Sequence, residues 1–252
     1  MTRVAAVGDI HLAPGSEGLL RPAFDTLGGA ADVLLLAGDL TRHGTPEEAA
    51  VVAGEVRGLP VPVVAVLGNH DYQSDRQDEV ADVLREAGAT VLEGTFVRID
   101  VDGDGGRDGG GDGAPVAVGI AGTKGFCGGF AGRCAGDFGE PEMKALVRAS
   151  RESAEGLRRA LDGLADTGCA VRIALTHFAP VPDTLAGEPL EIFPFLGSYL
   201  LAEAIDAAGA DLAVHGHAHH GTEHGMTAGG IRVRNVAMPV IGRAFAVYHL
   251  AP

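Results

Sequence analysis

The chain has 252 residues, of which 46% are hydrophobic, and its formal net charge at pH 7 is −15. This length and apolar content suffice for a sizeable core, whereas the acidic balance argues against nucleic-acid partners, which require a basic surface. No apolar run approaches the roughly 20 residues of a membrane-spanning helix, and the N-terminus lacks a secretory apolar segment, so we expect an untargeted, cytoplasmic protein without membrane contact.

The first ninety residues alternate between short β-rich runs and helical stretches. We expect strands at "RVAAVGD", "DVLLLAGD" and "VPVVAVLGN", and helices near 20–28, 46–57 and 76–87. This alternation predicts βαβ crossovers and a largely parallel sheet. The second helix has a clear start signal, because Thr45 is a good N-cap, Pro46 suits the first turn, and Glu47 and Glu48 favour the positive end of the helix dipole.

Two glycine-rich segments follow. Residues 103–113, "GDGGRDGGGDG", cannot build a core, so we expect a flexible hairpin insertion, with a calcium site as the alternative because carboxylates converge there. Residues 123–140 contain Lys124, Phe126, Phe130 and Arg133. They predict either a lid that stacks a base and pairs with a phosphate, or an ordinary surface loop.

The remainder returns to strands and helices without a linker. We expect a helix near 141–166, the strand "AVRIALTH", a helix near 197–208, the strand "DLAVHGHAH", and closing strands near 231–236 and 244–250. One domain over residues 1–252 is therefore predicted. The fold class is α/β, a double β-sheet sandwich with helices on both outer faces.

Side chains that can bind metal follow five apolar runs. They are Asp9 and His11 in "GDIH", Asp39 in "GDL", Asn69 and His70 in "GNHD", His177 in "LTH", and His215, His217 and His219 in "HGHAH". A single such residue is usually a cap or a satisfied polar group, but capping alone does not account for five strand ends. Imidazole, carboxylate and amide oxygen together suit divalent Zn, Mn or Fe.

The spacing of these residues predicts their geometry. Side chains two apart on a strand point the same way, so Asp9 and His11 should share a side, and His217 and His219 should repeat that arrangement. With Asp39, Asn69 and His177 they make seven candidate ligands. Seven is too many for one structural zinc but suits two metal ions that share a bridging carboxylate.

In this order, the blocks Asp-x-His, Gly-Asp, Gly-Asn-His, a later His and Gly-His-x-His resemble those of the calcineurin-like metallophosphoesterases. The resemblance runs from Asp9 to His219 and implies that family's double β-sheet sandwich and dinuclear metal centre. It implies that Asp9, His11 and His219 hold one metal, that Asn69, His177 and His217 hold the other, and that Asp39 bridges them.

The chemistry of such a centre follows from its two cations. They lower the pKa of a shared water enough to supply hydroxide near neutral pH, and the phosphorus is attacked in line with the departing oxygen. His70, which is not a ligand in the family, is the candidate for protonating that oxygen. Several relatives place an acid or amide where this chain has Arg42. Either Asp71 orients His70 instead, or Arg42 contacts a substrate phosphate.

The stretch "GDLTRHG" resembles small-molecule phosphodiesterases, including the cyclic-nucleotide group, more than the protein phosphatases. We therefore predict a dinuclear metal-dependent phosphohydrolase that acts on a phosphodiester of a small nucleotide-like molecule, with phosphomonoester hydrolysis as the alternative. A catalytically inactive binding scaffold would have lost ligands, and a nuclease conflicts with the acidic charge. His215, His220 and His224 are expected to support the ligands or to face solvent.

Overall fold

The computed structural model describes residues 1–101 and 115–251. The predicted insertion at 103–113, with its alternative calcium site, lies outside the described residues.

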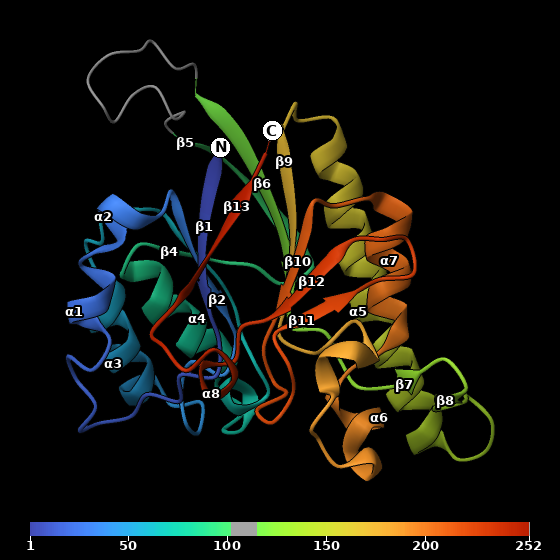
Figure 1. The fold of residues 1–252 in the computed structure, drawn as a ribbon. Helices are drawn as coiled ribbons and strands as arrows, with labels where there is room; N and C mark the ends of the chain where they lie inside the picture. The colour runs from blue at the N-terminus through green and yellow to red at the C-terminus, as the bar shows by residue number, and fades with distance from the viewer. Residues whose placement is uncertain (102–114, 252) are drawn as a thin grey trace.

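Two large sheets form the centre of the molecule (Figure 1). The first has the order β13 (Ala246–Leu250), β1 (Thr2–Val7), β2 (Val33–Ala37), β3 (Val63–Val66) and β4 (Ala89–Val91). The second has the order β11 (His224–Met226), β12 (Arg232–Asn235), β10 (Leu212–His215), β9 (Val171–Thr176), β6 (Val116–Thr123) and β5 (Thr95–Val101). Neighbouring strands are parallel except for β13, β11 and β5, each of which pairs antiparallel at a sheet edge.

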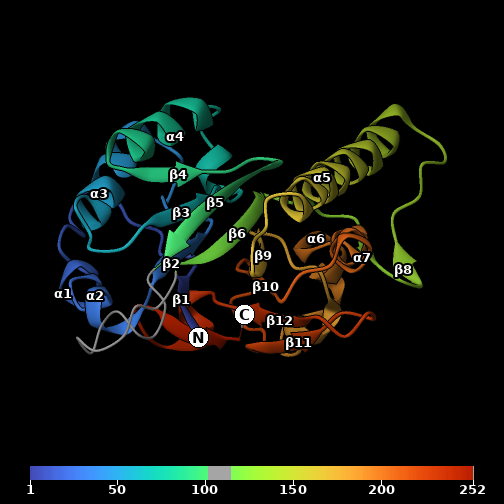
Figure 2. The same ribbon diagram turned by 90° about the horizontal axis from the view of Figure 1, so that it is seen from above.

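Helices cover both outer faces, as the view from above shows (Figure 2). The first sheet is covered by α1 (Arg21–Phe24), α2 (Leu27–Ala30), α3 (Pro46–Val56) and α4 (Gln77–Glu86), and the second by α5 (Pro141–Ala165) and α7 (Tyr199–Ala208). The short elements are η1 (His70–Tyr72), β7 (Gly129–Phe130), β8 (Arg133–Cys134), η2 (Pro182–Leu185), η3 (Leu190–Ile192), α6 (Phe193–Leu196) and α8 (Met238–Ile241). The predicted double β-sheet sandwich is confirmed.

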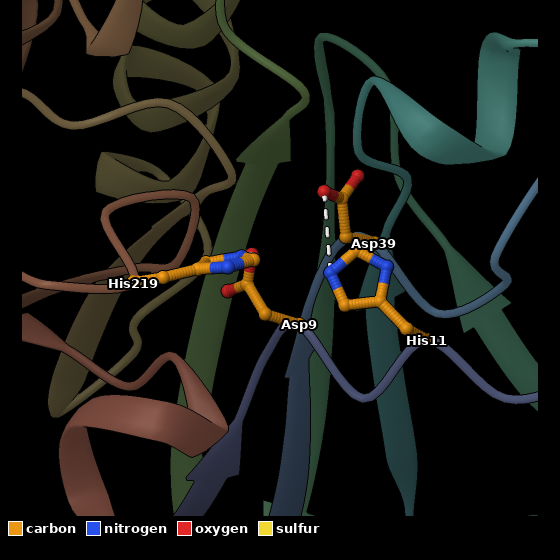
Figure 3. A group of neighbouring side chains, drawn as sticks. All are labelled: Asp9, His11, Asp39 and His219. Atoms are coloured by element: carbon orange, nitrogen blue, oxygen red, sulfur yellow. Dashed lines mark hydrogen bonds and ion pairs between the residues drawn. The ribbon is translucent and has the colours of Figure 1, made fainter.

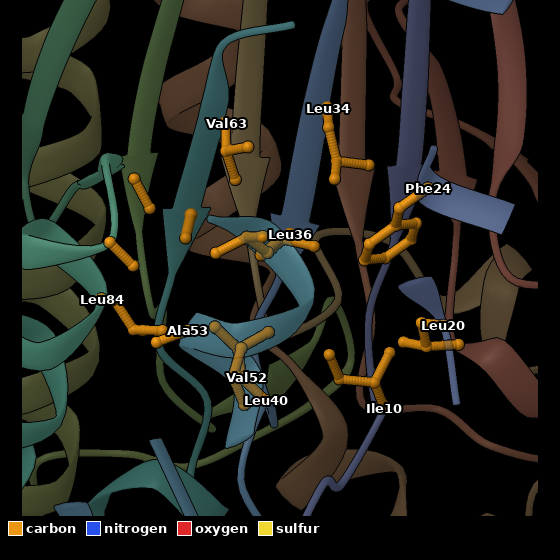
Figure 4. Packing of buried hydrophobic residues seen from close by; sticks show 14 of the residues in the cluster. Ile10, Leu20, Phe24, Leu34, Leu36, Leu40, Val52, Ala53, Val63 and Leu84 are labelled. Carbon is orange, nitrogen blue, oxygen red and sulfur yellow. The ribbon is translucent and has the colours of Figure 1, made fainter. Parts of the chain in front are cut away.

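The strands of the first sheet are apolar on both faces because each face is covered. In β2, Leu34 and Leu36 pack against the helices (Figure 4), whereas Val33, Leu35 and Ala37 pack against the second sheet. All five side chains are fully buried. Continuous apolar runs of this kind are typical of parallel strands between two layers.

One predicted helix differs in the structure. The stretch near 20–28 forms two single turns, α1 and α2, which break after Phe24. Gly28 and Gly29 lie within the second turn, and glycine lowers helix stability by about 1 kcal/mol relative to alanine. By contrast, α3 begins as predicted, with the Thr45 hydroxyl accepting a hydrogen bond from the Glu48 amide.

Candidate metal centre

The predicted ligands gather at the C-terminal ends of the strands, but several lie beyond them. Strand β1 ends at Val7 and β10 at His215. Asp9, His11 and His217 follow in loops with φ values of 56°, 43° and 71°. Asp9 and His11 do converge in one group, but the predicted reason, strand alternation, is wrong because left-handed loop residues orient these side chains, and His217 and His219 belong to different groups.

This backbone conformation is uncommon for residues other than glycine. Asp39 shares it, with φ of 50°. Asp and His adopt it more readily than bulky residues do, yet each instance costs on the order of 1–3 kcal/mol and persists where the surrounding structure enforces it. Four residues with this strained backbone at one site indicate that the fold tolerates a local loss of stability because the strain orients these side chains.

Two glycines allow the backbone to approach the carboxylates closely. A Cβ atom on Gly68 would lie 2.1 Å from Asp39 Oδ1, and one on Gly216 would lie 2.2 Å from Asp9 Oδ2. Both distances are far below van der Waals contact. Each glycine precedes a candidate ligand by one residue, so the Gly-Asn and Gly-His pairs reflect a steric requirement.

The first group of ligand atoms comes from Asp9, His11, Asp39 and His219 (Figure 3). One atom from each lies within 4.8 Å of the others. His219 Nε2 is 2.9 Å from Asp9 Oδ1, and His11 Nε2 is 3.8 Å from Asp39 Oδ2. These four side chains converge on a space that one cation could occupy.

The second group comes from Asp39, His177 and His217, again within 4.8 Å of one another. Asn69 joins this group, because its Oδ1 atom is 3.0 Å from His177 Nε2. The same nitrogen is 3.3 Å from Asp39 Oδ1. Asp39 therefore belongs to both groups and presents one oxygen to each.

Three of the candidate imidazoles favour the neutral form that metal ligands require. Burial lowers the pKa of His11, brings that of His217 to about 3, and holds that of His177 well below its usual range. His177 Nδ1 is 2.9 Å from the Ala37 carbonyl, which places its proton on Nδ1 and leaves the Nε2 lone pair facing the site. Neutral imidazole is the form that binds metal.

Two further features fit a cation. His11 Nε2 is buried without a hydrogen-bond partner among the described residues, and such an orphaned atom costs free energy unless something binds it. Burial raises the pKa of Asp9 to about 6, while the carboxylate of Asp9 raises the pKa of His219. Asp9 and His219 share a proton through their 2.9 Å hydrogen bond. A bound cation would replace this proton and stabilise the Asp9 carboxylate, so the residues present fit divalent metal ions.

His70 lies beside this centre and is half-exposed. Its Nδ1 atom is 2.8 Å from the Arg42 carbonyl oxygen, and its Nε2 atom is 4.0 Å from Asp39 Oδ2. Its ring meets the His11 ring edge-on, with centroids 4.5 Å apart. The group that positions His70 is thus the main chain of Arg42, which the sequence pattern did not reveal, while the Arg42 residue itself is exposed.

Asp71 is fully buried and holds two loops together. Its Oδ1 atom accepts hydrogen bonds from the amide and hydroxyl of Thr41, and its Oδ2 atom accepts from the amides of Leu40 and Gly68. These partners come from the loops after β2 and β3. The hydrogen bonds of Asp71 therefore join the loop of Asp39 to that of Asn69, and none of them reaches the His70 ring.

Of the four predicted lid residues, Lys124 lies over the Phe126 ring, and Phe130 pairs with Arg133 in the β7–β8 hairpin, but the last two have different surroundings. Phe130 is buried in a small cluster with Ala179, Leu185, Leu196 and Ala218. Arg133 is exposed and lines a largely apolar cavity of about 650 Å³, whose other walls include Cys127, Met143, Leu146, Pro194 and Phe195. The Phe195 carbonyl is 3.3 Å from His217 Nε2, so this cavity adjoins the metal centre.

The additional histidines have different surroundings. His215 is fully buried, with Nδ1 2.7 Å from the Gly216 carbonyl and Nε2 2.8 Å from the Thr184 hydroxyl, and burial lowers its pKa to about 4. His220 and His224 are exposed. His215 thus supports the loop that carries His217, and the other two face solvent.

A family model described as calcineurin-like phosphoesterase matches residues 2–221. The chain belongs to the calcineurin-like phosphoesterase family, and the predicted protein class, metal-dependent phosphoesterases, is confirmed. Over 87 residues the chain is 33% identical to a probable cyclic nucleotide phosphodiesterase from Synechococcus sp., a match that covers 31% of this chain and 34% of the relative. The chain thus aligns with about a third of the length of this curated relative.

Solved structures with low sequence identity share the fold. A phosphopantetheinyl hydrolase from Mycobacterium tuberculosis matches with a TM-score of 0.62 at 16% identity, over 94% of this chain and 89% of that one. A putative 5′-nucleotidase from Staphylococcus aureus matches with a TM-score of 0.53 at 16% identity, over 92% of this chain and 48% of that one.

No helix within residues 1–101 and 115–251 combines the length and apolar character needed to cross a membrane.

Proposed function

We propose that this protein is a dinuclear metal-dependent phosphohydrolase that cleaves a phosphodiester bond in a small nucleotide-like substrate. The observation that carries the proposal is the position of Asp39, which is shared by two convergent ligand groups. A shared carboxylate between two sets of imidazole and carboxylate ligands suits a two-metal site. Preference for a diester is supported by the "GDLTRHG" stretch and by the partial similarity to the Synechococcus sp. protein.

Seven side chains would hold the ions. Asp9, His11 and His219 would bind one, Asn69, His177 and His217 the other, and Asp39 both. When bound, two divalent or mixed-valence ions (Mn, Fe or Zn) would supply hydroxide near neutral pH and neutralise charge on the phosphoryl oxygens.

His70 would serve the leaving group. Its hydrogen bond to the Arg42 carbonyl requires a proton on Nδ1, which leaves Nε2 as the atom that exchanges a proton. That atom lies on the side of Asp39. A protonated Nε2 could therefore donate to the oxygen that departs from phosphorus. The exposed Arg42 side chain is free of this orienting task and could contact a substrate phosphate.

Asp71 would keep the Asp39 loop and the Asn69 loop in position relative to each other, because it accepts hydrogen bonds from both loops. The apolar cavity beside Phe195 could receive the organic part of the substrate, since it adjoins the His217 loop. The acidic net charge and the cavity volume of about 650 Å³, which is ordinary for a small-molecule site, favour a small phosphorylated molecule over nucleic acid.

A hydrolysis screen tests the proposal. Purified protein, stripped with a chelator and reloaded separately with Mn, Fe or Zn, is assayed against matched phosphodiesters and phosphomonoesters. We expect metal-dependent turnover with higher kcat/KM on diesters. Higher kcat/KM on monoesters would select the alternative, and metal-loaded protein that hydrolyses neither class would refute the proposal.

A further inference from the structure

Lys124 lies beside the metal centre, although none of the predicted ligand blocks contains it. It directly follows β6, where Thr123 pairs with Thr176 of β9. The main-chain amides of His177 and Phe178 both donate to the Lys124 carbonyl at 3.0 Å. The backbone of Lys124 is therefore anchored to the loop that supplies a candidate metal ligand.

Three aromatic rings surround the ammonium group. Lys124 Nζ is 4.8 Å from the ring centroid of Tyr72, 4.9 Å from that of Phe126 and 5.3 Å from that of Phe178. Its one hydrogen bond among the described residues is a long contact of 3.4 Å to the Gly125 carbonyl. An ammonium has three donors, so most of its hydrogen-bonding capacity is unused.

The neighbouring carboxylate, Glu93, binds other groups and forms no direct ion pair with this cation among the described residues. Glu93 Oε1 accepts from the Thr123 hydroxyl at 2.6 Å, and Oε2 accepts from the Lys124 main-chain amide at 3.1 Å. The Tyr72 hydroxyl makes a 3.5 Å contact with the same carboxylate. Glu93 thus holds the backbone and the ring in place, and no ion pair to the ammonium is formed within the described chain. Burial lowers the pKa of Lys124, and the nearby charge of Glu93 only partly opposes this shift.

The ring cage is continuous with the metal centre. The Phe178 ring centroid is 4.4 Å from that of His217 and 5.6 Å from that of His177. Tyr72 follows His70 by two residues in the same short turn, η1. One wall of the cage therefore touches candidate ligands, and another is attached to the candidate proton donor.

We propose that Lys124 is a substrate-binding residue whose ammonium donates a hydrogen bond to a phosphate oxygen of the substrate. This inference rests on the proposed function. In a chain with net charge −15, an anionic substrate needs local positive charge. A phosphate oxygen would give the ammonium the charge-assisted hydrogen bond that it lacks, and the rings would keep water from competing for it.

The sequence provides an internal control, because Lys124 and Lys144 are the two lysines of the chain. Lys144 is exposed near the start of α5. Metal-loaded protein is reductively methylated with and without inorganic phosphate, and each lysine is quantified by mass spectrometry. We expect phosphate to slow methylation of Lys124 and to leave Lys144 unaffected. Equal rates at Lys124 with and without phosphate would overturn the inference.

Variants give a second measurement. Lys124→Met keeps the apolar stem, so the melting temperature and metal content should stay near wild type. The inhibition constant for phosphate and the KM for a diester should each rise about 10- to 100-fold, the loss expected for one charge-assisted hydrogen bond. Lys124→Arg should restore part of the lost affinity for phosphate and for the diester, and Lys144→Met should change neither the inhibition constant nor the KM. Unchanged constants in Lys124→Met would refute the role.

The two proposals can fail separately. Protection from methylation needs no turnover, so a wild-type protein that hydrolyses no ester yet shows protection would count against the proposed function alone. A wild-type protein that hydrolyses diesters but shows neither protection nor altered constants would count against Lys124 alone.

Discussion

Replacing Gly68 with alanine should disable the metal centre through a single methyl group. The added Cβ would lie 2.1 Å from Asp39 Oδ1 and 2.3 Å from the Asp39 main-chain nitrogen. Rotation of the Asp39 side chain relieves only the first contact, so the backbone of one loop must move. The φ value of Gly68 is not in the left-handed region. The effect is therefore steric and does not arise from backbone strain at this residue.

The size of the displacement follows from the distances. Ordinary Cβ contacts begin near 3.4 Å and the Asp39 nitrogen would lie at 2.3 Å, so the loops of Asp39 and Asn69 must separate by roughly 1 Å. Overpacking of this kind costs about 1–3 kcal/mol. Misplacement by about 1 Å can reduce a catalysed rate about a hundredfold. Because Asp39 belongs to both ligand groups, metal affinity should fall at both sites.

Gly54→Ala is the matched control. Gly54 lies inside helix α3, and a Cβ there would meet nothing within 4 Å. It should raise stability by about 0.5–1 kcal/mol and leave activity unchanged. Chemical denaturation of chelator-treated protein measures stability without the metals, and metal content and turnover are measured after reloading. Gly68→Ala protein that retains two metals per chain and normal turnover would refute the reasoning.

Three further changes test other parts of the structure. Asp39→Asn should remove more activity than any other single ligand change. The loss should exceed the roughly 10- to 100-fold loss that is typical of residues that only orient ligands. Two retained metals with near-normal turnover would exclude a bridging role. His70→Ala should keep its metals and lose little activity on an activated aryl diester but about a hundredfold on an ester with an alkoxide leaving group; equal losses on both, with chemistry rate-limiting, would exclude proton donation. Phe24→Ala should cost about 3–5 kcal/mol of unfolding free energy, because the ring is fully buried, while metal content per folded chain stays constant; denaturation midpoints equal to wild type would contradict this.

The order of strands and helices was readable from the sequence because local patterns determine it. Fully apolar runs such as "VLLLA" require cover on two faces, and this requirement alone favours parallel strands between layers. The cap at Thr45 and the proline after it mark the start of α3 without any tertiary information. The residue types at the strand ends also predicted a candidate ligand set, since carboxylate, amide and imidazole in this order match a known family, and these side chains lie together in the structure.

Other features depended on contacts between residues distant in the chain. The φ values of Asp9, His11 and His217 are imposed by packing against neighbouring loops, so strand periodicity could not predict them. His70 is positioned by a main-chain carbonyl, which every residue possesses and no motif distinguishes.

The most informative case is Lys124, whose sequence neighbours are compatible both with a phosphate-binding lid and with an ordinary surface loop. Two of its three rings, Tyr72 and Phe178, come from segments about 50 residues away on either side. Only the packing of β6 beside β9, with the β3 loop nearby, brings them around one ammonium group. The sequence determined which side chains are available and where strands and helices form, because it specifies residue identity and local periodicity directly. Tertiary structure decided which of those groups lose their water and meet, because burial and proximity arise only when the sheets and loops pack together.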